Sequence, residues 1–143
     1  MGKIFIKFLR IIFMELLKVK EKFQEAIELL GNAIQENNLK IVSRINAQEN
    51  LAKANLKIKG NYIFEVFRPD LAYKLFNLDI RAGIVPPLRI YVFEKGDETF
   101  VEYWKPSEIL NKWGAEEIGR ELDETFYKIM KRLSVIERES LSL

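Results

Sequence analysis

The segment from residue 83 to residue 107 constrains the fold of this chain more than any other. Two apolar runs that are typical of β-strands, 88–94 and 98–104, flank the dipeptide Gly96-Asp97. This dipeptide favours a two-residue hairpin turn with glycine in the first central position. Because proline has no backbone N–H for a β-ladder, Pro86-Pro87 is expected at the start of the first strand. The segment therefore predicts an antiparallel β-hairpin.

The turn also sets the register of the hairpin. Side chains alternate between the two faces of a strand, so the expected cross-strand pairs are Lys95–Glu98, Phe93–Phe100, Tyr91–Glu102 and Arg89–Trp104. One face of the hairpin is apolar and belongs to the core. The other face mixes aromatic and charged side chains, and we interpret it as a surface for a small ligand or a protein partner. Its residues are Arg89, Tyr91, Phe93, Phe100, Glu102 and Trp104.

The composition excludes several kinds of chemistry. The 143 residues include no Cys and no His, which removes thiol and imidazole nucleophiles, bases and metal ligands. We predict no cofactor and no metal site. A net charge of +2, from 23 basic and 21 acidic residues, argues against nucleic acid as a partner. A Lys- and Glu-rich chain without Cys is typical of thermophiles, and without a signal-peptide pattern we expect a cytoplasmic protein.

The rest of the chain predicts an α+β fold. Apolar residues recur with helical spacing over 20–37 and 115–136, and they alternate over 39–45 and 61–68. These patterns indicate two long helices and two strands in addition to the hairpin. We therefore expect a curved antiparallel sheet of about five strands, with both long helices packed on one face.

The C-terminal boundary of the domain is expected near the end of the second long helix. We predict a single domain over residues 13–137 and a frayed tail over 138–143. Residues 1–12 precede this domain as an apolar and basic extension.

Residues 1–19 leave three alternatives open. Their basic residues recur at helical spacing in an otherwise apolar segment, which favours a helix packed on the domain or on a second subunit. In a variant of this interpretation, residues 13–19 form a first strand. The functional alternative is an amphipathic helix that lies on a membrane surface. The charged residues Lys7, Arg10 and Glu15 argue against a transmembrane span.

Glu65 is the one weak catalytic candidate. A carboxyl group in an apolar strand is a potential general acid or base with a raised pKa. We favour the alternative that Glu65 forms an ion pair across the sheet with Arg44 or Arg89. Arg89 and Trp104 suit either a cation–π contact with a ligand or the face of a dimer. We therefore rank a binding protein first, a membrane-surface protein second and an enzyme third.

Two segments carry a resemblance to a known family. They are FEVFRPDLAYKLFN, residues 64–77, and IVPPLRIYVFEKGDETFVEYWKPSEIL, residues 84–110. Over roughly residues 13–133 the chain resembles the domain-of-unknown-function 302 family, and Phe67 and Pro87 stand near positions where some members carry Cys. The resemblance implies a β-α-β(4)-α arrangement like that of the TATA-binding protein, often as a homodimer, and no established activity. The matching residues are Glu65, Pro69, Pro86, Arg89, Gly96, Tyr103 and Pro106.

Overall fold

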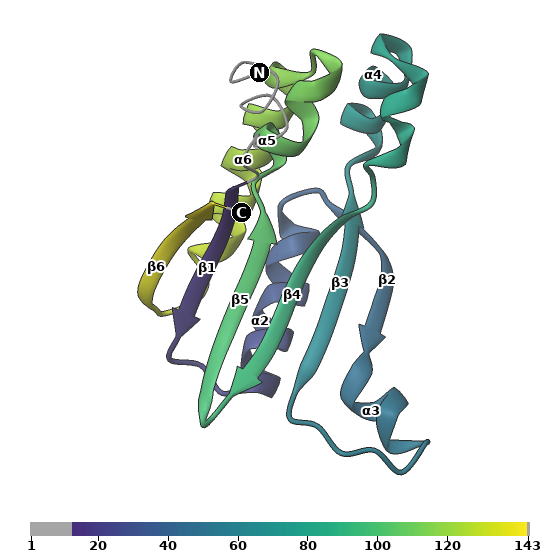
Figure 1. Ribbon diagram of the computed structural model, residues 1–143. Helices are drawn as coiled ribbons and strands as arrows, with labels where there is room; N and C mark the ends of the chain where they lie inside the picture. Colours follow the sequence, from purple (N-terminus) through teal and green to yellow (C-terminus); the bar gives the residue numbers. More distant parts are fainter. Residues whose placement is uncertain (1–12, 143) are drawn as a thin grey trace, which may run out of the picture.

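The hairpin at Gly96 lies in the middle of an antiparallel sheet. The computed structural model describes residues 13–142, and its six strands follow the order β2-β3-β4-β5-β1-β6 (Figure 1). One strand more is present than we predicted. The strands are β1 (Phe13–Val19), β2 (Lys40–Asn46), β3 (Asn61–Phe67), β4 (Leu88–Lys95), β5 (Glu98–Trp104) and β6 (Val135–Ser142).

The hairpin has the register that its turn predicted. Lys95 pairs with Glu98, Phe93 with Phe100 and Tyr91 with Glu102. Gly96 has a φ of 64°, a left-handed conformation that glycine adopts without steric cost. The expected pair Arg89–Trp104 is wrong, because the ladder between β4 and β5 ends at Tyr91–Glu102. On the other edges of these strands, Trp104 pairs with Met14 of β1 and Arg89 pairs with Glu65 of β3.

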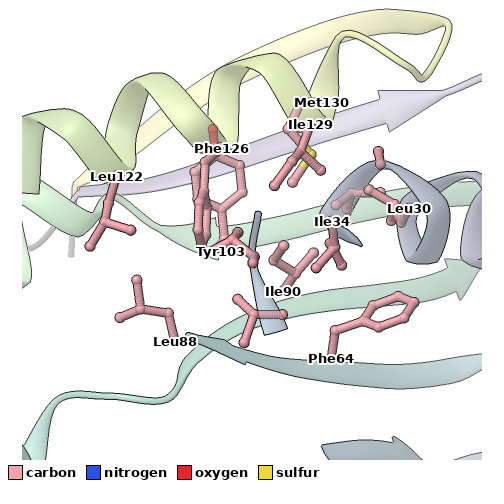
Figure 2. Packing of buried hydrophobic residues seen from close by; sticks show 14 of the residues in the cluster. Leu30, Ile34, Phe64, Leu88, Ile90, Tyr103, Leu122, Phe126, Ile129 and Met130 are labelled. Carbon is pink, nitrogen blue, oxygen red and sulfur yellow. The ribbon is translucent and has the colours of Figure 1, made fainter. Parts of the chain in front are cut away.

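Two long helices cover one face of the sheet, as predicted. They are α2 (Phe23–Glu36) and α6 (Glu116–Met130), and α2 lies behind the sheet in the view of Figure 1. Their apolar stripes meet the inward side chains of the central strands in one core (Figure 2). The Tyr103 ring packs edge-on against Phe126 of α6, with 5.2 Å between ring centroids. The core residues of the helices include Leu30, Ile34, Leu122, Phe126, Ile129 and Met130.

Short helices flank the two ends of the sheet. Helix α3 (Ala47–Ala52) follows β2. Two helical arms project beyond the opposite end, at the top of Figure 1. The first arm consists of α4 (Pro69–Leu78) and the 3-10 helix η1 (Ile80–Ile84). The second consists of α5 (Pro106–Leu110) and the 3-10 helix η2 (Asn111–Trp113). Both long helices pack on one face of the sheet. We call the other face, which neither of them covers, the open face.

The N-terminal segment corrects one expectation. Residues 13–19 form β1, which is paired with β5 on one side and β6 on the other. A helix over the whole of 1–19 is therefore wrong for this part, and the alternative of a first strand is confirmed. The extension over residues 1–12 lies outside the described residues, so the membrane-surface hypothesis is confined to it. No helix within residues 13–142 combines the length and the apolar character that a bilayer crossing requires.

The C-terminal segment corrects a second expectation. The long helix ends at Met130 rather than near 136, and the expected frayed tail is part of strand β6. The connecting turn is fixed by hydrogen bonds from the Lys20 N–H to the Ser134 carbonyl (2.9 Å) and from the Ser134 N–H to the Glu21 carboxylate (2.8 Å). Because β6 is an edge strand, backbone pairing with β1 holds it although many of its side chains are polar and exposed.

Candidate ligand-binding groove

A groove of about 1080 Å³ lies on the open face, between the two helical arms. Strands β3, β4, β5 and β1 form its floor. The residues that precede β4 and those that follow β5 in the chain form its end walls. We call it the open-face groove. The floor carries both apolar and charged side chains, whereas the walls are largely apolar. Floor residues include Ile63, Glu65, Arg89, Tyr91, Glu102 and Trp104, and wall residues include Ile84, Pro86, Pro87, Ile109 and Trp113.

The groove contains four of the six residues that we predicted as a binding surface. Arg89, Tyr91, Glu102 and Trp104 line it. Phe93 and Phe100 lie on the same face nearer the turn, with their rings stacked at a centroid distance of 5.3 Å. Phe93 also stacks on Tyr91 at 4.9 Å, so these two phenylalanines form an aromatic floor that continues beyond the groove.

The wall residues were not predicted as part of a site. Ile84, Ile109 and Trp113 come from η1, α5 and η2, and the folded sheet brings these segments to the same end. The sequence contained one signal for a wall, which is the Pro86-Pro87 doublet directly before β4. Proline there shapes the chain before the strand begins, but the pattern says nothing about which distant segment lies opposite it.

Glu65 and Arg89 form an ion pair on the floor. The Arg89 Nε lies 3.3 Å from the Glu65 Oε2, and the two residues are opposite each other in β3 and β4. Arg44, the other expected partner, lies over the Phe64 ring at 5.1 Å. The favoured alternative, an ion pair of Glu65 across the sheet, is therefore confirmed with Arg89 as the partner.

Glu102 occupies a different environment. It is half-buried in the middle of the open face, opposite Tyr91 of β4 and Leu16 of β1. Burial raises the pKa of the Glu102 carboxyl above its usual value, because a charge loses hydration when water is excluded. Within residues 13–142, Glu102 takes part in no ion pair, since the nearby cations Arg89 and Lys18 contact Glu65 and Glu98 instead.

Hydrogen bonds and close contacts hold the floor and the walls in place. The Asn61 side-chain amide donates to the Tyr91 hydroxyl at 2.6 Å, which orients that ring on the floor. The second arm is held by α6, because the backbone N–H of Ser107 donates to the Asp123 carboxylate at 2.9 Å. Gly119 of α6 lies directly against Ser107. The groove therefore has a defined shape before any ligand binds.

A salt bridge holds the first arm. Arg68, directly before α4, contacts Asp70 at 2.9 Å and Glu121 of α6 at 2.8 Å. These contacts raise the pKa of Arg68 and lower that of the Asp70 carboxyl. In the described part of the chain, no three Asp or Glu side chains lie close enough together to hold a metal ion.

Comparisons with known proteins agree with this architecture. No protein of curated function matches the chain. The crystal structure of an uncharacterised conserved DUF302 protein from Bacillus stearothermophilus is similar, with a TM-score of 0.76. The two chains are 19% identical, and the match covers 83% of this chain and 96% of the other. The family model described as "Domain of unknown function DUF302" matches residues 16–134, and the chain therefore belongs to the DUF302 family.

Proposed function

We propose that this protein is a non-catalytic binding protein that holds a small amphipathic molecule in the open-face groove. The observation that carries the proposal is the combination of largely apolar end walls with a few polar groups on the floor. Small-molecule sites are concave and mostly apolar, and they contain a small number of positioned polar groups. The volume of about 1080 Å³ is slightly above the usual range for such sites, roughly 300–1,000 Å³.

The chemistry of the lining favours binding over catalysis. The chain has no Cys or His to act as nucleophile or base, and Glu65 is paired with Arg89. Trp104 is 52% exposed at the edge of the floor. An exposed indole next to apolar walls offers a large contact area to a ligand at a small entropic cost.

The proposal is tested with N-phenyl-1-naphthylamine, an uncharged dye that fluoresces when it enters an apolar site. We expect saturable binding to the protein and a loss of affinity of roughly fivefold or more in Trp104→Ala, because an aromatic contact contributes about 1 kcal/mol. Tyr127→Ala is the matched control, since Tyr127 is 47% exposed on α6 and does not line the groove. It should bind the dye like the unaltered protein.

Two results would overturn the proposal. One is the absence of saturable dye binding to a folded protein. The other is equal dye affinity in Trp104→Ala and Tyr127→Ala, because the dye would then occupy another surface.

We also propose that the protein forms the homodimer that the family resemblance implies, through the first arm. Five apolar side chains of α4 and η1 are exposed there, and charges of both signs surround them. Exposed apolar patches of this kind are typical of interaction surfaces, and a patch with mixed charges is suited to contact with its own copy. The five residues are Tyr73, Phe76, Leu78, Ile80 and Ile84.

A further inference from the structure

On the floor of the open-face groove, one carboxylate, that of Glu102, has no cationic partner among residues 13–142. Glu102 has Phe100 and Trp104 as its same-face neighbours on β5, Tyr91 opposite it on β4 and Leu16 opposite it on β1. Three of these four neighbours are aromatic and the fourth is aliphatic. A carboxylate in such surroundings has lost part of its hydration and has gained no fixed positive charge in return.

The described cations on the neighbouring strands and on the end wall already have other partners. On β4, Arg89 contacts Glu65 at 3.3 Å. On β1, Lys18 forms a salt bridge with Glu98, next to the hairpin turn. On the end wall, Lys112 lies over the Trp113 ring at 5.4 Å. Each of these cations is therefore engaged by a group other than Glu102.

The part of the lining that comes from residues 13–142 has an excess of negative charge. Three carboxylates, those of Glu65, Glu102 and Glu108, face two cations, those of Arg89 and Lys112. The whole chain has a net charge of +2, so the groove differs in sign from the rest of the molecule. A ligand that supplies one positive charge would balance the lining.

We infer that the natural ligand of the open-face groove carries a cationic nitrogen, an ammonium or guanidinium group, which binds the Glu102 carboxylate while an apolar body lies against Trp104 and the end walls. This inference rests on the proposed binding function and deepens it. The rings of Tyr91 and Trp104 flank Glu102, and aromatic faces attract cations in desolvated sites. A charged hydrogen bond between the ligand and Glu102 would replace the lost hydration.

The raised pKa of Glu102 supports the same conclusion. A bound cation favours the ionised carboxylate, so the affinity for such a ligand should decrease when the pH falls through the pKa of Glu102. The titratable and charged groups that face Glu102 are Tyr91 and Arg89 on β4 and Lys18 on β1. Arg89 and Lys18 remain charged over the acidic range, so the change expected there among Glu102 and the groups that face it is the protonation of Glu102 itself.

The test is displacement of N-phenyl-1-naphthylamine at pH 8 by three probes of similar shape. They are 4-phenylbutylamine, 4-phenyl-1-butanol and 5-phenylpentanoate, which are cationic, neutral and anionic at this pH. We expect the amine to displace the dye at a concentration about tenfold lower than the alcohol, because hydrogen bonds between charged groups are the stronger ones. The carboxylate should be the weakest of the three.

Variants of equal charge identify the group responsible. Glu102→Gln should reduce the preference for amine over alcohol to about one while it still binds the dye. Glu28→Gln makes the same change of charge at an exposed position on α2 and should keep the preference. Three results would overturn the inference but leave the proposed function standing. They are equal potency of amine and alcohol on the unaltered protein, a preference for the amine that survives in Glu102→Gln, and a preference for the carboxylate. A protein that does not bind the dye would refute the proposed function itself.

Discussion

At Glu102, the ligand binding that we propose and the stability of the fold oppose each other. Its carboxyl is half-buried among Tyr91, Phe100, Trp104 and Leu16, and its pKa is raised because the ionised form loses hydration there. A carboxyl whose pKa is higher in the folded than in the unfolded state stabilises the fold at low pH. That stabilisation is lost as the pH rises through the folded pKa. Ionised Glu102 therefore costs stability when no ligand is bound.

This cost leads to a prediction about Glu102→Gln. The variant should have a higher free energy of unfolding than the unaltered protein at pH 8, because it removes a poorly solvated charge. The gain should be small, since Glu102 keeps contact with solvent, and it should vanish as the pH falls below the raised pKa. Urea unfolding at pH 8, 6 and 4 measures it. A variant that is less stable than the unaltered protein at pH 8 would contradict the prediction, and Glu28→Gln serves as the control.

At the scale of elements, the contact between α5 and α6 determines where one wall of the groove stands. A Cβ atom at Gly119 of α6 would lie 2.5 Å from the Cα of Ser107 in α5. Real Cβ atoms do not approach backbone atoms so closely, so the absence of a side chain at Gly119 allows the two helices to touch. The Asp123 carboxylate, one turn further along α6, accepts the Ser107 N–H at 2.9 Å. Together these contacts fix the arm that carries Ile109 and Trp113.

We therefore expect Gly119→Ala to lower the free energy of unfolding by about 1–3 kcal/mol, the usual cost of overpacking. Alanine is intrinsically the better helix former by up to ~1 kcal/mol, but the backbone of α5 has to move to admit the methyl group. The control is Gly31→Ala in α2, where the new Cβ would meet the flexible guanidinium of Arg44 at 3.3 Å. Chemical denaturation of both variants measures the difference. An equal effect of the two substitutions would contradict the account of the contact.

At the scale of the whole molecule, the exposed first arm determines the oligomeric state that we propose. Ile80 is 75% exposed and Ile84 is 81% exposed, which is unusual for large aliphatic side chains. If two copies bury these arms together, light scattering should report twice the mass of one chain. Ile80→Asp, which places a charge in the contact without lining the groove, should shift the protein towards the monomer. A monomeric unaltered protein would refute the dimer and leave the groove proposal intact.

The hairpin and the two long helices could be predicted because their signals are local. Gly96-Asp97 specifies the turn, and alternation on either side specifies which residues share a face. This was enough to place Tyr91, Phe93, Phe100 and Glu102 correctly on the open face. The predicted pair Arg89–Trp104 is missing because the pairing of β4 with β5 does not extend beyond Tyr91–Glu102.

One physical reason explains why neither strand β6 nor the groove walls could be predicted from the sequence. Val135–Ser142 is extended because it pairs with β1 at the other end of the chain, and a polar edge strand has no strong apolar pattern of its own. Ile109 and Trp113 are wall residues only because the sheet brings α5 and η2 to the end where Pro86 and Pro87 stand. Such long-range pairings have no counterpart in the local pattern.

The lining of the open-face groove has one practical consequence. The chain contains two tryptophans, Trp104 and Trp113, and both line the groove. Their ultraviolet emission therefore originates at the site, without background from indoles elsewhere in the protein. The tryptophan fluorescence of the unlabelled protein can therefore report ligand binding directly. Fractions of a metabolite extract can be added to the protein one by one to find a compound that changes this emission.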